Sequence, residues 1–415
     1  MQAKNAGLAN AQKTTMKNSF KETEIGSLPE DWNVAKFEQA ISKKRFKVGK
    51  IRQREYNKVG KYPVIDQSQK FIAGFTDDSE RVYQGDLPIV IFGDHTRIFK
   101  LIDFPFVIGA DGVKVILPEK VLVNPLFFYY ALSNLKIQSR GYNRHYPLLR
   151  EKVIPIPPLL EQQRIAKVLG VIQRAIEWQN KIIEAGNDLR KSLMQELFTK
   201  GFGHTEFKET EIGIIPTSWE AIGLGDIATI STGTTPSTLN KGYYNGEIPF
   251  VKTNEITNNI IRNAQVLITK KAVDDYNLKV YPSGTVFLAM YGQGKTRGQS
   301  ALLSISATTS QNTAAIIPRA NMDSFFLWCY LQYQYEKLRK TGIQGHISHL
   351  NLGYVKSFIV PLPSLREQKE IARILSTVNK KIEVEERKKA ALSELFKTML
   401  QKLMTGEIRL KDVEV

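Results

Sequence analysis

Side chains able to recognise nucleic-acid bases are concentrated in short polar segments between apolar runs of the chain. Arginine can pair with guanine, and glutamine or asparagine with adenine, at the major-groove edge of a base pair. In the first half of the chain, the candidates for contact with DNA are Gln67, Gln69, Lys70, His95, Arg97, Arg140, Asn143, Arg144 and His145. In the second half they are Lys252, Asn254, Gln293, Lys295, Arg297, Gln311, Asn312, Gln344 and His346. Taken one at a time, such loop residues are more often turn formers than base contacts.

A basic stretch between Lys43 and Lys61 is the second feature with chemical meaning. Glu55 is its only acidic residue, and the stretch has little apolar content, which predicts a loop or an arm. DNA phosphates would supply its counter-charge. A solvated surface is the alternative interpretation. The candidates for phosphate contact are Lys43, Lys44, Arg45, Lys47, Lys50, Arg52 and Arg54.

The segment Ala289-Met-Tyr-Gly-Gln-Gly-Lys-Thr296 is similar to a relaxed phosphate-binding loop that follows a strand. Such a loop needs a helix after it, because the helix N-terminus supplies the amides that bind phosphate. Here Ser300–Ile305 has the pattern of a strand, and the repeat counterpart at Gly93 lacks the lysine. We therefore favour a hairpin tip, and a nucleotide-dependent enzyme that uses Lys295 and Thr296 is the alternative.

Asn124-Pro-Leu-Phe127 resembles the tetrapeptide of adenine N6-methyltransferases, with Leu126 in place of the second proline. Asparagine before a proline is also typical of a helix start, where asparagine caps the helix and proline takes its first position. The chain lacks a convincing glycine-rich turn for S-adenosylmethionine. The tetrapeptide is therefore interpreted as a helix cap, and no cofactor site is expected in this chain.

Composition limits the class of protein. The 415 residues include 58 Lys+Arg against 41 Asp+Glu, a formal net charge of +17 that favours a polyanionic partner such as nucleic acid. Cys329 is the only cysteine, which excludes a disulfide framework and a cysteine-ligated zinc site. The five histidines are too scattered to suggest a metal site. The single cysteine also fits a reducing cytoplasm, which is the location expected. No apolar run is long enough to span a membrane.

The sequence contains an internal repeat. Phe20-Lys-Glu-Thr-Glu-Ile-Gly26 returns unchanged as Phe207-Lys-Glu-Thr-Glu-Ile-Gly213. Further matches follow in unbroken order as far as Ile165-Ala166, which pairs with Ile371-Ala372. Each half begins with β-branched and aromatic runs cut by Gly, Pro, Asn and Asp, which predicts a mixed α/β globule. The strands expected are at 87–92, 112–117, 285–288 and 313–317, and the helices at 127–135 and 325–338.

Each half ends in a long amphipathic segment, 159–199 and 365–405, that contains no proline. Apolar residues in both follow the alternating spacing of a coiled-coil seam. The seam residues are Ile165, Leu169, Ile172, Ile176, Ile183, Leu193, Leu197, Ile371, Leu375, Val378, Ile382, Leu392, Phe396, Met399 and Leu403. Two such rods would most simply pack antiparallel, although amphipathic helices more often complete a core. Polar interruptions of the seam would mark splaying, a partner contact or solvated defects: Gln179, Gly186, Arg190, Glu385 and Lys389.

The whole pattern resembles the specificity subunit of a type I restriction–modification system. The motifs that carry the resemblance are Pro155-Ile-Pro-Pro-Leu-Leu-Glu-Gln-Gln-Arg-Ile-Ala166, its counterpart Pro361–Ala372, and the Ile25 to Trp32 and Ile212 to Trp219 openings. The resemblance implies two tandem target-recognition domains separated by two long antiparallel coiled-coil helices, with a pseudo-twofold internal repeat. The ranges expected are 1–19 for an N-terminal arm, 20–157 and 201–363 for the domains, 158–200 and 364–406 for the helices, and 407–415 for a tail.

The function implied by this resemblance is non-catalytic, sequence-specific binding of double-stranded DNA. Each domain would read one half of a bipartite target, and the helix pair would set the half-site spacing and dock two methyltransferase subunits. Restriction subunits would join the complex, with S-adenosylmethionine and ATP bound by these partners and not by this chain. A coiled-coil adaptor for proteins alone is a further alternative. Base-contacting residues cannot be carried over from the family, because its recognition domains vary.

Overall fold

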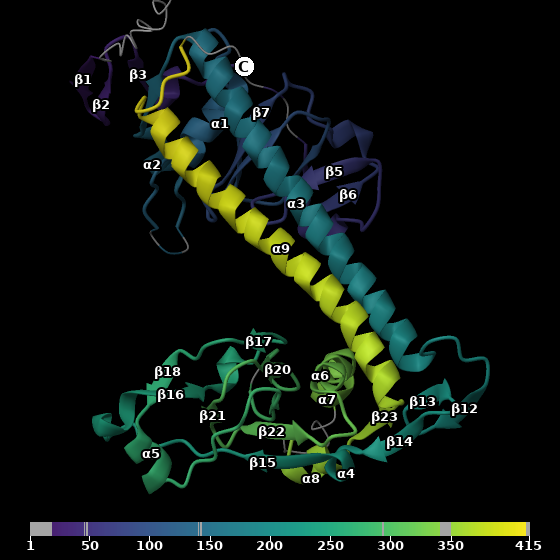
Figure 1. Ribbon diagram of the computed structural model, residues 1–415. Helices are drawn as coiled ribbons and strands as arrows, with labels where there is room; N and C mark the ends of the chain where they lie inside the picture. The colour runs from purple at the N-terminus through teal and green to yellow at the C-terminus, as the bar shows by residue number, and fades with distance from the viewer. Residues whose placement is uncertain are drawn as a thin grey trace, which may run out of the picture. The chain divides into compact units, whose positions relative to one another are not determined.

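The computed structural model describes residues 19–44, 46, 49–139, 141, 143–292, 294–340 and 350–411 of the chain (Figure 1). The chain divides into two compact units, Met1–Trp178 with Lys388–Val415, and Gln179–Arg387. Both long helices are cut by this division, so the units do not coincide with the six linear ranges expected from the sequence. The expected arm at 1–19 lies outside the described residues except for Ser19.

The globular part of the first unit is built on two small sheets. One has the strand order β4-β9-β5-β6, formed by Lys50–Ile51, Val107–Gly109, Tyr62–Ile65 and Gly74–Thr76. The other has the order β10-β7-β8, formed by Val113–Ile116, Ile89–Gly93 and Phe99–Ile102. Strand β7 is buried on both faces, because Val90 and Phe92 pack toward helix α1 (Pro125–Ser133) and Ile89 and Ile91 pack with the first sheet. This two-sided burial explains its unbroken apolar sequence.

The second unit repeats this plan with a larger sheet. Its order is β15-β22-β19-β20-β17, formed by Ala228–Thr232, Thr313–Pro318, Val286–Ala289, Ser300–Leu303 and Ile260–Ile261. A smaller sheet has the order β18-β16-β21, formed by Val266–Ile268, Tyr244–Val251 and Thr308–Thr309. The expected strands are confirmed as β7, β10, β19 and β22. The helix expected at 325–338 is instead two helices, α6 (Ser324–Tyr333) and α7 (Tyr335–Lys340), with the break at Gln334.

The internal repeat is confirmed residue by residue in two strand pairs of each unit. Hairpin β1-β2 (Phe20–Thr23, Gly26–Pro29) and hairpin β12-β13 (Phe207–Thr210, Gly213–Pro216) have the same register, with the first residue opposite the last. Strands β3 and β11 (Asn33–Lys36, Val153–Ile156) pair antiparallel, as do β14 and β23 (Glu220–Gly223, Ile359–Leu362). The remaining short helices are α2 (Tyr146–Arg150), α4 (Leu224–Ile227), α5 (Lys270–Asp275) and α8 (Leu352–Ser357).

The predicted cap at Asn124 is confirmed. Its Oδ1 accepts from the backbone nitrogens of Leu126 and Phe127 at 3.1 and 3.0 Å, and Pro125 occupies the first turn of α1. Asp323 caps α6 in the same way, at 2.9 Å from each of two backbone nitrogens. The Asn-Pro-Leu-Phe segment is therefore explained by local helix geometry.

Both long segments are single helices, α3 (Leu159–Thr199) and α9 (Leu365–Met404). In the first unit the start of α3 packs with the end of α9, through Ile165 and Leu169 against Leu403. In the second unit the end of α3 packs with the start of α9, through Leu197 and Ile371. The helices therefore run antiparallel, as the teal and yellow helices of Figure 1 show. All the predicted seam residues are buried or half-buried. The two helices form a seam with each other, and their ends also complete the domain cores, so both interpretations of the amphipathic segments hold.

Three of the seam's interruptions have polar partners on the other helix: Gln179, Arg190 and Glu385. Gln179 Nε2 donates to Glu385 Oε2 at 2.6 Å, and both side chains are buried. Gly186 lies against Ile382, and Arg190 Nη1 is 3.5 Å from Asn379 Oδ1. At Gln179 and Glu385 the expectation of splaying or a solvated defect is wrong, because the two buried side chains bond to each other across the helices. A buried polar pair of this kind fixes the register of two packed helices. At Lys389 the expectation stays a prediction.

The Glu-Gln motif joins each helix to its own domain. Gln162 Oε1 accepts from the backbone nitrogen of Asn124 at 2.8 Å, and Gln368 Oε1 accepts from that of Asp323 at 2.8 Å. Glu161 accepts from Trp32 Nε1 at 3.0 Å, and Glu367 accepts from Trp219 Nε1 at 3.0 Å. The motifs that repeat most closely in the sequence therefore build the two junctions.

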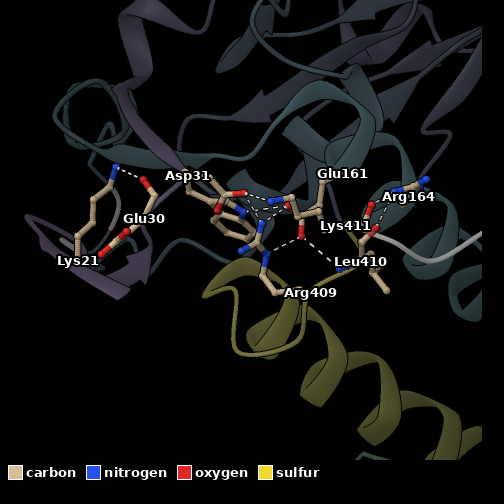
Figure 2. A network of polar contacts seen from close by, with 9 residues as sticks. Lys21, Glu30, Asp31, Glu161, Arg164, Arg409, Leu410 and Lys411 are labelled. Carbon is tan, nitrogen blue, oxygen red and sulfur yellow. Dashed lines mark hydrogen bonds and ion pairs between the residues drawn. The ribbon is translucent and has the colours of Figure 1, made fainter. Parts of the chain in front are cut away.

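The C-terminal segment closes the first junction (Figure 2). Arg409 donates to both oxygens of Glu161 at 2.8 Å and to Asp31 at 2.8 Å, and the backbone nitrogen of Leu410 donates to Glu161 at 3.1 Å. In the second unit His204 occupies the equivalent position, with Nε2 2.9 Å from Glu367 Oε1. The expected tail at 407–415 is thus, over its described residues 407–411, part of the first domain's junction.

Candidate nucleic-acid interface

Three polar loops of the first unit meet at one end of strands β5 and β7. Gln67 links two of them, because its Nε2 donates to the backbone oxygen of Asp111 at 3.1 Å and its Oε1 accepts from the backbone nitrogen of His95 at 3.1 Å. Buried Asp94 brings in the third loop by accepting from the backbone nitrogens of His145 and Tyr146 at 2.9 and 2.7 Å. The segments chosen from sequence as base readers therefore form one cluster.

The candidates within this cluster divide into exposed and structural side chains. Gln69, Lys70, Asn143 and Arg144 are exposed to solvent. Gln67 cross-links the loops as described, and Arg97 Nη1 donates to the backbone oxygen of Ile137 at 3.0 Å. His145 is fully buried, with Nδ1 2.9 Å from the backbone oxygen of Asp94. His95 is half-buried, and Arg140 lies outside the described residues. A buried or cross-linked side chain shapes the surface that its exposed neighbours present.

The basic stretch is only partly a loop. Lys50 and Ile51 form β4, which pairs in parallel with β9, so the segment is anchored in a sheet and the expectation of a loose arm is corrected. The backbone nitrogen of Arg52 donates to Glu55 at 3.0 Å, which gives the single acid a local structural role. The basic side chains of the stretch that are described are exposed: Lys43, Lys44, Lys50, Arg52, Arg54, Lys58 and Lys61. Arg45 and Lys47 lie outside the described residues.

In the second unit the loops after β16, after β19 and before β22 also meet. The backbone nitrogen of Met290 donates to the backbone oxygen of Asn312 at 3.0 Å, and Thr253 Oγ1 lies 3.5 Å from Ser310 Oγ. Four of the predicted candidates there are exposed: Lys252, Asn254, Lys295 and Gln311. A fifth, Asn312, is half-buried. Gln311 Oε1 accepts from Thr235 Oγ1 at 2.8 Å.

Arg297 is the structural member of this second cluster. It is 9 % exposed, and its Nη2 donates to the backbone oxygen of Arg339 at 2.8 Å, which ties the hairpin to α7. Tyr335 Oη donates to the backbone oxygen of Lys295 at 2.7 Å. Gln293, Gln344 and His346 lie outside the described residues.

A groove of about 550 Å³ beside β17 was missed by the sequence analysis. Its lining is rich in side-chain amides, and Arg262 at its edge lies 3.4 Å from Glu383 of α9. Within the described residues, no hydrogen bond uses the exposed side chains of Asn254, Asn263 or Gln265. The signal that could have indicated the groove is the density of Asn and Gln between Asn254 and Gln265.

The hairpin interpretation of the glycine-rich segment is confirmed. Strands β19 and β20 pair antiparallel, with Val286 opposite Leu302, so a strand and not a helix follows Lys295. No helix N-terminus therefore stands where a phosphate-binding loop requires one. Within the described residues, no cluster of metal-binding side chains is found, and none of the helices has the length and apolarity to cross a membrane.

One scaffold that occurs twice and carries two different sets of exposed polar loops defines a duplicated recognition protein. The chain belongs to the family of type I restriction modification DNA specificity domains, whose model matches residues 29–185 and 216–394. Specificity subunits of this family are the non-catalytic DNA-recognition components of their systems.

Relatives over nearly the whole chain support this assignment. The chain is 28% identical over 424 residues to the type I restriction enzyme MjaVIII specificity subunit of Methanocaldococcus jannaschii, covering 95% of this chain and 97% of that protein. It is 24% identical over 341 residues to the EcoR124I/EcoR124II specificity subunit of Escherichia coli, covering 78% and 81%. The fold is similar to the type I S subunit from M. genitalium, with a TM-score of 0.62, 17% identity and coverage of 90% and 96%. A chain from a structure on complex assembly of the type I R-M system matches with a TM-score of 0.53, 15% identity and coverage of 92% and 99%.

Proposed function

We propose that each domain of this specificity subunit reads one half of a split DNA target. The observation that carries the proposal is the repeated scaffold with unlike loops: the strand registers of the two units agree, while Gln67 and Asp94 have no like residue at the corresponding loops. Exposed amide, lysine and arginine side chains at those loops have the chemistry of base-edge and phosphate contact. The exposed basic stretch of the first unit would hold the duplex backbone.

We propose that helices α3 and α9 set the separation of the two half-sites. At 1.5 Å per residue, a helix the length of α3 is roughly 60 Å long. The buried pair of Gln179 and Glu385 supports one fixed register between the helices. Half-sites read from one face of the duplex would be about one helical turn, ~34 Å, apart, or slightly displaced if the DNA bends.

We propose that the outer face of α3 docks methyltransferase subunits. An apolar stripe on this face has the 4-3-4-3-4 spacing of a coiled-coil seam, and its large side chains are exposed. The members of this outer stripe are Val171, Ala175, Trp178, Ile182, Ala185 and Leu189, with exposures of 53, 63, 46 and 53 % for Val171, Trp178, Ile182 and Leu189. An exposed apolar row on one helix is a typical site for a partner helix.

The remaining parts of the system belong, on this proposal, to the partners. Methyltransferase subunits would bind S-adenosylmethionine and restriction subunits would use ATP, while the present chain would act on double-stranded DNA in the cytoplasm. No observation in the structure favours the nucleotide-dependent enzyme or the protein-only adaptor.

Domain exchange tests the modular account. The chain is assembled with its methyltransferase subunits after residues 20–157 are replaced by the equivalent domain of another family member, and methylated bases are mapped. One half of the modified sequence is expected to change while the other half and the spacer length stay the same. A change in both halves, or in neither, would contradict the assignment of one half-site to each domain.

A further inference from the structure

Lys100 is a buried lysine in the first domain. It lies on β8 opposite Ile91 of β7, and its side chain is 4 % exposed. Removing an ammonium group from water is unfavourable unless its three donors find partners. Burial lowers the pKa of Lys100 from its ordinary value, which agrees with such desolvation. A lysine at this position therefore needs a structural or functional reason.

Its partners are the two ends of one loop. Lys100 Nζ donates to the backbone oxygen of Asp66 at 2.7 Å and to that of Lys70 at 2.5 Å. The Asp66 carboxylate, 3.9 Å from Nζ, also accepts from the backbone nitrogen of Ser68 at 2.9 Å. One ammonium group thus closes the Asp66–Lys70 loop across its base.

This loop is the hub of the first polar cluster. The Gln67 side chain joins it to Asp111 and His95, and Thr96 Oγ1 donates to the backbone oxygen of Gln67 at 2.7 Å. Gln69 and Lys70 project from the same loop and are exposed. A shift of the loop base would therefore displace both its exposed side chains and the neighbouring loop.

The second domain lacks this lysine. Strand β20 is the counterpart of β8, and Ala301, opposite Phe287, occupies the position of Lys100. The loop after β16 is held instead by Glu255, which accepts from the backbone nitrogens of Lys252 and Gln265, each at 2.9 Å. The two domains stabilise equivalent loops by different means, so one domain can serve as an internal control for the other.

We propose that Lys100 is a positioning residue that holds the Asp66–Lys70 loop in the conformation used to read the first half-site. This inference rests on the proposed function, in which the first domain reads one half of the target. Lys100 itself is buried and would touch no base; it would act through the backbone that carries Gln69 and Lys70.

The test is Lys100→Met in the full complex with methyltransferase subunits, with methylated sites mapped across a genome. Methionine keeps the length and apolar stem of lysine but donates no hydrogen bond. Base preference is expected to fall at least tenfold at one or more positions of one half-site, and the preference in the other half-site is expected to be unchanged. Lys120→Met is the matched control, because exposed Lys120 also donates to a backbone oxygen, that of Leu87 at 3.1 Å, but outside the polar cluster.

The possible outcomes separate positioning from stability. Reduced modification with unchanged base preference in both halves would overturn the proposal, because a merely destabilised chain reads fewer sites but reads them correctly. Lys100→Gln retains a shorter donor and should give an intermediate loss of preference. Failure of both variants to assemble would assign Lys100 to the fold and would also overturn the proposal. A failure of the proposed function is distinguishable, because the unaltered complex would then show no split target.

Discussion

At the residue scale, the two domains pair the same junction glutamate with different side chains. Glu161 accepts a hydrogen bond from the guanidinium group of Arg409. Glu367 has instead a hydrogen-bond contact with the ring nitrogen Nε2 of His204. Burial raises the pKa of Glu161, but hydrogen bonds from Arg409, Trp32 and the backbone of Leu410 outweigh it and hold the pKa below the ordinary value of 4.5. The Arg409 hydrogen bond likewise lowers the pKa of Asp31. The C-terminal segment is thereby bound to the first domain by charge as well as by packing.

Replacing Glu161 with glutamine should destabilise the first unit. Arg409, 11 % exposed, would then face a neutral amide and keep Asp31 as its remaining carboxylate partner. Breaking one of its two ion pairs is expected to lower the free energy of unfolding by up to about 3 kcal/mol. Thermal unfolding of the full chain at neutral pH measures the effect. Glu367→Gln is the matched control and should destabilise less, since it removes no guanidinium pair. Equal losses in the two variants would contradict the role given to Arg409.

The same junction predicts a pH dependence. Because the folded-state pKa of Glu161 lies below its unfolded value, the unfolded chain binds more protons in acid. The stabilisation is therefore fully present above about pH 5 and is lost as the pH falls below 4.5 toward the folded-state value. Glu161→Gln should flatten this part of the stability profile, and an unaltered acid dependence in the variant would assign the effect to other carboxylates.

At the element scale, long helices were the most predictable part of the molecule. The 4-3 spacing of apolar residues predicted α3 and α9 almost to the residue. An apolar repeat of this period forms a continuous seam only when the whole segment is one helix. The pairing of Gln179 with Glu385 could not be predicted, since it depends on the register between two distant segments. The exposed outer stripe has the same spacing as the seam and could have been found by searching each helix for a second period.

A charge in the outer stripe should weaken assembly without unfolding the chain. Trp178→Glu places a carboxylate on an apolar docking face, and loss of a tryptophan anchor weakens binding by about 2 kcal/mol or more. The affinity for methyltransferase subunits, measured by calorimetry, is expected to fall at least about tenfold, with the melting temperature unchanged. Asn180→Glu adds the same charge at an exposed position off the stripe and should bind as before. Unchanged affinity in Trp178→Glu would remove α3's outer face from the interface.

The loop clusters illustrate what residue type alone cannot reveal. The polar segments chosen by residue type lie together in the fold, although β5 and β7 belong to different sheets. Residue type could not separate exposed Gln69 from cross-linking Gln67, or exposed Arg144 from buried His145, because burial is decided by distant partners such as Asp94. The groove at Asn254 and Gln265 needed the structure, since its lining comes from two loops and a short strand.

At the scale of the whole molecule, duplication explains both the repeat and the differences. The conserved features between the halves are the hairpins, the junction motifs and the helices, and the unlike features are the exposed loops. Such a design keeps the frame constant while each domain's loops can differ. We propose that this frame presents two separate readers to one DNA molecule.

This proposal is tested by a map of modified adenines in cells that carry this subunit with its methyltransferase partner. The expected result is a bipartite sequence: two short defined half-sites separated by an undefined spacer of constant length, with the half-sites about one helical turn apart. A single uninterrupted recognition sequence, or half-sites at variable separation, would contradict the proposal of two separate readers.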